Sequence, residues 1–180
     1  MPLVQLEDAV MCGDLVQVRA LLEGDRRLKA EATGQLIVRA LEANRHAVAL
    51  YLAGALRPSV FELAALGMQG PLHAMVRQSH GQLTARDAHG RTALHLAAVF
   101  ERDAVVKLLL ELGAAANATD HRGRTPLHHA AMRGSIRSVI ALQRVSNLSH
   151  EDDAGQTALA LAIEHDHVEV TQLLADWVEF

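Results

Sequence analysis

Apolar residues recur three and four positions apart in short runs, and turn-forming residues separate the runs. Clear examples are 105–110, 138–142 and 170–174, where valine, leucine and isoleucine fall on one side of a 3.6-residue period. This spacing predicts amphipathic helices. Each of these runs follows a shorter apolar run after one turn. We therefore expect an all-α chain built from helix–turn–helix units.

A twelve-residue pattern recurs along the second half of the chain. Segment 87–98 is repeated at 120–131, after 33 residues, and again at 152–163, after 32 more. Its glycine stands where a turn can require a positive φ, at Gly90, Gly123 and Gly155. Its threonine is placed to cap the helix that follows, at Thr92, Thr125 and Thr157, with Pro126 suited to the first helical position.

These segments resemble the ankyrin repeat, whose unit of about 33 residues carries a Thr-Pro-Leu-His core. Residues 125–128 match that core fully, 92–95 lack the proline, and 157–160 also lack the histidine. Segment 113–118 resembles the hairpin-forming stretch of the family, and 146–148 is a shortened form of it. The resemblance implies an all-α ankyrin-repeat solenoid of helix-turn-helix units with short β-hairpin-like turn tips.

The first half carries a weaker form of the same pattern. Paired apolar runs around residues 9–24, 40–55 and 61–76 extend the series to six repeats in one domain, 1–180. The approximate bounds are 1–30, 31–57, 58–86, 87–119, 120–151 and 152–180. The turns within the repeats are expected near Gly13, Asn44, Gly67, Glu101, Gly134 and Asp166. Between the second and third repeats, the alternative to a hairpin is a plain loop at residues 56–59, in which Pro58 ends one helix and Ser59 caps the next.

Composition narrows the functional classes. Half of the 180 residues are apolar but only 3% are aromatic, which favours close packing of small helices. The net charge of −4 offers no basic stripe for phosphates, so no nucleic-acid partner is expected. A single cysteine, Cys12, excludes an intrachain disulfide. We see no signal peptide and no membrane-spanning run, and we expect a cytoplasmic protein with no membrane partner.

The family resemblance also implies which residues meet a partner on the concave face. They lie beside the turn glycines and at the ends of the first helices. The predicted partner-binding residues are His89, Arg91, Val99, Phe100, His121, Arg122, Arg124, Met132, Arg133, Asp153, Gln156, Glu164 and His165. Arginine and aromatic residues are enriched at binding hot spots. Phe100 is either an exposed anchor beside Val99 and Met132 or folded onto the next repeat.

No enzyme motif is present, and no catalytic residue, cofactor or metal is predicted. The eleven histidines include His128, His129, His150, His165 and His167, but none has the spacing of a zinc site. His95 and His128 match the structural histidine of the family, which hydrogen-bonds a neighbouring turn. We expect a monomeric, non-enzymatic scaffold or adaptor for a protein partner. An inhibitor or immunity-type protein and a module self-associating through Trp177 and Phe180 are the alternatives.

Overall fold

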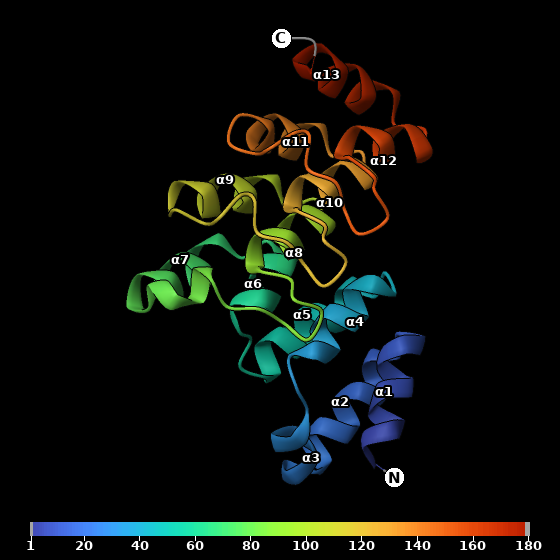
Figure 1. Cartoon of the computed structure of the whole chain (residues 1–180). Helices are drawn as coiled ribbons and strands as arrows, with labels where there is room; N and C mark the ends of the chain where they lie inside the picture. The colour runs from blue at the N-terminus through green and yellow to red at the C-terminus, as the bar shows by residue number, and fades with distance from the viewer. Residues whose placement is uncertain (1, 179–180) are drawn as a thin grey trace. The chain divides into compact units, whose positions relative to one another are not determined.

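The computed structural model describes residues 2–178, apart from the side chains of residues 26, 30, 31 and 178. This part of the chain consists of helices and connecting turns without strands, which confirms the all-α prediction (Figure 1). The chain divides into two compact units, Met1–Leu66 and Gly67–Phe180. Phe180 lies outside the described residues.

The N-terminal unit is made of paired helices that share a core of Leu6, Ile37 and Leu52, all fully buried. Helices α1 and α2 pack together, as do α4 and α5, and α4 also contacts α1 and α6. The bounds are α1 Pro2–Cys12, α2 Leu15–Gly24, α3 Arg26–Glu31, α4 Gln35–Glu42, α5 His46–Ala55 and α6 Val60–Leu66.

Two local signals shape the connections of this unit. The unpredicted helix α3 is preceded by its N-cap Asp25, whose carboxylate accepts hydrogen bonds from the backbone N–H groups of Arg27 and Leu28, at 2.8 and 3.2 Å. Before α6 the chain forms a plain loop around Pro58, which was the alternative to a hairpin. Ser59 caps α6: its backbone N–H donates to Glu62 Oε2 at 2.6 Å, and its hydroxyl accepts from Phe61 N–H. The bond from Ser59 N–H to the carboxylate three residues later is one of the two bonds of a capping box.

The C-terminal unit stacks helix pairs in chain order. Helices α8 and α9, α10 and α11, and α12 and α13 form pairs, while α10 lies between α8 and α12 (Figure 1). Fully buried alanines, Ala97, Ala98, Ala130 and Ala131, allow this close approach of helices. The bounds are α7 Gln69–Gln78, the 3-10 helix η1 His80–Leu83, α8 Ala93–Val99, α9 Asp103–Glu111, α10 Pro126–Met132, α11 Ile136–Gln143, α12 Ala158–Glu164 and α13 Val168–Val178.

The predicted turn and cap positions are confirmed. The six residues expected at the turns within the repeats all have positive φ, between 57° and 84°. Thr92, Thr125 and Thr157 are the N-cap residues of α8, α10 and α12, and Pro126 opens α10. The local backbone of each repeat is therefore specified by a few residues at its turns.

Candidate binding surface

An aspartate organises the tip that precedes each first helix of the last three repeats. Asp87 Oδ1 accepts hydrogen bonds from the backbone N–H groups of His89 and Arg91, at 2.8 and 2.9 Å. The backbone N–H of Asp87 donates to the carbonyl oxygen of Arg91 at 2.9 Å and closes the turn. Asp120 and Asp152 repeat all three bonds at the next two tips. Each tip is thus held in one conformation by its own carboxylate.

Backbone hydrogen bonds also join neighbouring tips. The N–H of His121 donates to the carbonyl oxygen of His89, and the N–H of Asp153 donates to that of Arg122, both at 3.0 Å. Three tips from segments more than thirty residues apart are therefore linked in a row. The hydrogen-bonded backbone therefore fixes the spacing between the side chains of these residues.

Two structural histidines attach helices α8 and α10 to the tip that follows each of them. His95 Nδ1 accepts from the backbone N–H of Thr92 at 3.0 Å, so the ring proton resides on Nε2, which donates to the carbonyl oxygen of Arg124 at 3.1 Å. His128 makes the equivalent bonds to Thr125 and Gln156. The predicted structural role of both residues is confirmed.

Burial, and then the charge of His129, lower the pKa of His95 from 6.5 to about 4. Burial also lowers the pKa of His128. Both rings are therefore neutral at physiological pH. That is the state in which one ring nitrogen accepts a hydrogen bond and the other donates one.

The predicted partner-binding residues at the tips fall into two groups. His89, His121, Arg122 and Asp153 are exposed. The side chains of Arg91 and Arg124 are largely covered, with 14% and 16% exposed, and their Nε atoms lie 2.8 and 2.9 Å from Asp87 and Asp152. These two arginines hold the tips together, so Arg122 is the exposed guanidinium of this row.

At the ends of the first helices, Phe100 is half-buried, as are Val99 and Met132. Phe100 thus stands between the two predicted alternatives, since part of its ring is covered and part faces solvent. Arg133 is exposed and lies 3.8 Å from Glu101, an ion pair of the kind that solvent screens strongly.

In the last repeat, Gln156 Nε2 donates to Glu164 Oε2 at 2.7 Å and connects the tip to the helix end. His165 is exposed beside it, although its Nδ1 lies 2.9 Å from the carbonyl oxygen of Leu161. The tip and the helix end of this repeat therefore contribute to one surface.

Further residues, which sequence reasoning did not select, stabilise the tips. Arg86 Nη1 donates to the carbonyl oxygens of Gly90, at 2.8 Å, and Thr119. His129 Nε2 lies 2.8 Å from Asp120 Oδ2. Burial alone would raise the pKa of Asp120, but hydrogen bonds from His129 and two backbone N–H groups outweigh it and hold that pKa well below 3.8. The recurrence of aspartate at the first position of each tip was the sequence signal that could have identified these stabilising contacts.

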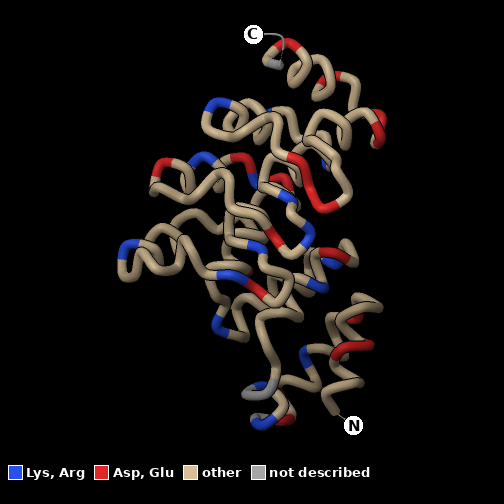
Figure 2. Tube along the Cα trace, in the orientation of Figure 1, with Lys and Arg blue, Asp and Glu red and all other residues tan. Residues whose placement is uncertain are grey.

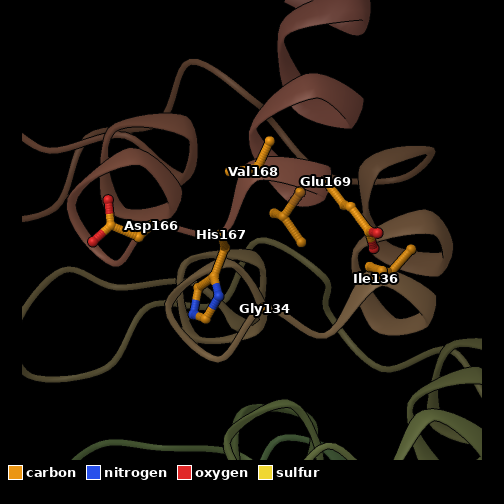
Figure 3. Close-up of a pocket in the computed structure, with 7 residues that line it drawn as sticks. Gly134, Ile136, Asp166, His167, Val168 and Glu169 are labelled. Atoms are coloured by element: carbon orange, nitrogen blue, oxygen red, sulfur yellow. The ribbon is translucent and has the colours of Figure 1, made fainter.

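Two further histidines also serve the structure. His150 Nε2 donates to the carbonyl oxygen of Gly123 at 3.1 Å, and His167 Nε2 donates to that of Met132 at 3.0 Å. His167 lies over Gly134 in a shallow pocket that Ile136, Asp166 and Val168 also line (Figure 3). Within residues 2–178, no group of three or more His, Cys, Asp or Glu side chains is arranged to hold a metal ion.

These features define an array of stacked helix pairs that presents a row of rigid tips. Two overlapping matches to the family model of ankyrin repeats (three copies) cover residues 6–142 and 106–179. The chain belongs to the ankyrin-repeat family. Ankyrin repeats are generally protein–protein interaction modules and are typically non-catalytic. No helix in the described part of the chain has the length and apolar character to cross a membrane.

Parts of the chain are similar in sequence to parts of curated relatives. Inversin of Canis lupus familiaris is 33% identical over 127 residues, which is 69% of this chain and 12% of inversin. The Neurogenic locus Notch protein of Drosophila melanogaster is 42% identical over 78 residues, 42% of this chain and 3% of that protein. NF-kappa-B inhibitor delta of Mus musculus is 37% identical over 105 residues, 56% of this chain and 32% of the inhibitor. The chain thus spans a third or less of each relative.

Proposed function

We propose that this chain is a non-enzymatic adaptor that binds a protein partner through the concave face expected for its family. The binding surface, called here the tip surface, consists of the exposed or half-exposed predicted residues: His89, Val99, Phe100, His121, Arg122, Met132, Arg133, Asp153, Gln156, Glu164 and His165. The proposal rests on one observation: some tip side chains stabilise the tips and others are exposed. Arg91 and Arg124 maintain the tips, whereas His121 and Arg122 face solvent on a backbone that is already fixed.

A fixed backbone favours binding because little conformational entropy is lost on association. The half-buried Phe100, Val99 and Met132 offer apolar area, and Arg122 and Arg133 add two guanidinium groups. Large apolar side chains next to arginine are typical of binding hot spots. The partner should therefore present a mixed or acidic surface with an apolar centre.

Site-specific photo-crosslinking tests this proposal. A photoreactive amino acid is placed at Arg122 or Phe100, and matched control variants carry it at Lys107 or Arg144, two exposed residues of the second-helix side. The chain is incubated with lysate of its source cells, and crosslinked proteins are identified by mass spectrometry. We expect one protein to be enriched at the tip positions and absent from the controls. Capture at the control positions alone would refute the tip surface.

An inhibitor would bind its target through the same tip surface as an adaptor. One relative is named an inhibitor, NF-kappa-B inhibitor delta. If the captured partner is an enzyme, its activity with and without the chain separates the two roles. Inhibition would be established if the wild-type chain lowers the activity of the partner and the Arg122→Glu, Arg133→Glu double variant does not.

Self-association is the second candidate function, because Trp177 keeps 45% of its surface exposed on the last helix. Sedimentation velocity over a hundredfold range of concentration tests it. We expect a monomer, whose sedimentation coefficient stays constant over this range. A rise with concentration that Trp177→Ala abolishes would establish the alternative.

A further inference from the structure

The charge of the C-terminal unit changes sign between two neighbouring repeats. Residues 120–151 contain five Arg and two Asp or Glu, a net charge of +3, whereas residues 152–180 contain seven Asp or Glu and no Lys or Arg, a net charge of −7. Figure 2 shows red segments on α12 and α13. Residues 87–119, with three basic and four acidic residues, are close to neutral. The charge therefore runs from near neutral to positive to negative along the stacked repeats.

The tip surface repeats this order at the ends of the first helices. Equivalent positions at the ends of α8, α10 and α12 form a line of six residues, called here the helix-end row: Val99 and Phe100, Met132 and Arg133, Glu164 and His165. The first pair is apolar and half-buried, the second adds an exposed arginine, and the third has an exposed glutamate. Because α10 lies between α8 and α12, Arg133 lies between the apolar pair and the carboxylate.

The tips carry charges in the same order. Arg122 is exposed on one tip, and Asp153 is exposed on the next. The two tips are adjacent, because the backbone N–H of Asp153 donates to the carbonyl oxygen of Arg122 at 3.0 Å. A cation is thus followed by a carboxylate at both ends of the first helices. A partner that crosses the stack meets the same sequence of charges at either end.

The charged groups of the helix-end row are available to a partner. Arg133 pairs with Glu101 at 3.8 Å, but both side chains are about half exposed, so a carboxylate of a partner can replace Glu101 at little cost. Glu164 accepts one hydrogen bond from Gln156 at 2.7 Å. An ionised carboxylate accepts several hydrogen bonds, so Glu164 can also pair with a cation of the partner.

The spacing of the row suits a helix. Packed helices lie about 8–10 Å apart, which sets the distance between successive repeats. An α-helix advances about 10.5 Å over seven residues, and side chains seven residues apart share one face. A β-strand covers about 10 Å in three residues, which places those side chains on opposite faces. One face of a single helix therefore matches three successive repeats, whereas one face of a strand does not.

We propose that the partner contacts the helix-end row with one helix that lies across the three repeats. This helix presents an apolar side chain to Phe100, a carboxylate to Arg133 and a Lys or Arg to Glu164, at intervals of about seven residues. The apolar contact supplies affinity, and the two opposite charges fix the order in which the side chains dock. This inference rests on the proposed function, because the helix-end row is part of the tip surface.

Three synthetic helical peptides of equal composition test the proposal by fluorescence anisotropy against the full chain. The first has Leu, Glu and Lys at successive seven-residue intervals. The second exchanges Glu and Lys, and the third moves Glu by two residues, away from the common face. We expect the first to bind at least about tenfold more tightly than the others. Docking in the reverse direction does not rescue the second peptide, since its Lys stays in the middle, opposite Arg133.

Variants of the chain assign the preference to the helix-end row. Arg133→Glu with Glu164→Lys should reverse the preference, so that the second peptide binds more tightly than the first. The matched control, Arg144→Glu with Asp176→Lys, exchanges the same charges at exposed positions of the second-helix side and should leave the preference unchanged. Glu101→Gln should tighten binding of the first peptide about two- to fivefold, because it removes the resting partner of Arg133. Circular dichroism checks that each variant is folded.

Equal binding of the first two peptides, no binding at about 1 mM, or the same reversal in the control variant would overturn the proposal. The proposed function fails separately. If photo-crosslinking at Phe100 captures a partner whose affinity Arg133→Glu with Glu164→Lys leaves unchanged, the tip surface stands and the ordered helix is refuted. If the peptides discriminate as expected but no cellular protein is captured at Phe100 or Arg122, the adaptor role fails and the recognition chemistry stands.

Discussion

His167 covers Gly134 so closely that a Cβ added to the glycine would lie 2.5 Å from Nδ1 of the imidazole ring (Figure 3). The same relationship occurs at Gly13 with Arg45 and at Gly67 with Arg102. The other repeats have Asn44, Glu101 or Asp166 at the equivalent turn position. Glycine thus stands at this turn where a long side chain of the following repeat lies over it.

The first prediction concerns the cost of that contact. Gly134→Ala should lower the free energy of unfolding by roughly 2–4 kcal/mol, because φ is +68° and His167 has to move. The matched control is Gly155→Ala, where φ is +73° and nothing lies within 4 Å of the added Cβ. It should cost only about 1 kcal/mol, from the backbone alone. Urea unfolding measures both, and equal losses would show that the ring does not constrain Gly134.

A second prediction is loss of stability in mild acid. The folded-state pKa of His95 is about 4, below the ordinary histidine value of 6.5, so the unfolded chain binds the proton more readily. Stability is therefore fully present above pH 6.5 and falls as the pH drops toward 4, by about 3 kcal/mol for this residue. His128 contributes in the same direction.

Chemical unfolding at several pH values measures this dependence. His95→Gln should reduce the slope of stability against pH between 6.5 and 4, whereas His89→Gln, at an exposed tip position, should not. A wild-type profile that is flat over this interval would contradict the assignment of a neutral buried imidazole.

The third prediction compares two ion pairs. Asp152 has 2% of its side chain exposed and accepts from Arg124 and two backbone N–H groups. Asp152→Ala should destabilise the chain by about 2–4 kcal/mol, since it leaves a covered guanidinium and tip N–H groups unpaired. Arg133→Gln removes an exposed pair and should cost under about 0.5 kcal/mol. Thermal and urea denaturation rank the two variants, and a reversed order would refute this account of the tips.

A fourth prediction addresses the domain organisation. We expect the chain to unfold as one domain although it forms two compact units. Trp177, the single tryptophan, reports on the last repeat, whereas far-ultraviolet circular dichroism reports on all helices. The two urea transitions should coincide. Separate midpoints would divide the chain into two independently unfolding parts.

Much of the repeat could be predicted because its backbone depends on a few neighbouring residues. The positive φ of Gly134 and the threonine caps follow from turn and capping preferences within four or five positions. Helix α3 was missed because it is short and lies between two repeats, although Asp25 is an ordinary cap. The candidate surface was predicted only by position, without knowledge of which side chains are free.

The sequence by itself determined the repeat period, the helix class and the turn residues. The tertiary structure alone decided that Arg91 and Arg124 turn inward while Arg122 faces solvent. The physical reason is distance along the chain. Arg124 meets Asp152 across 28 residues and His167 meets Met132 across 35, so these contacts exist only once the repeats have stacked.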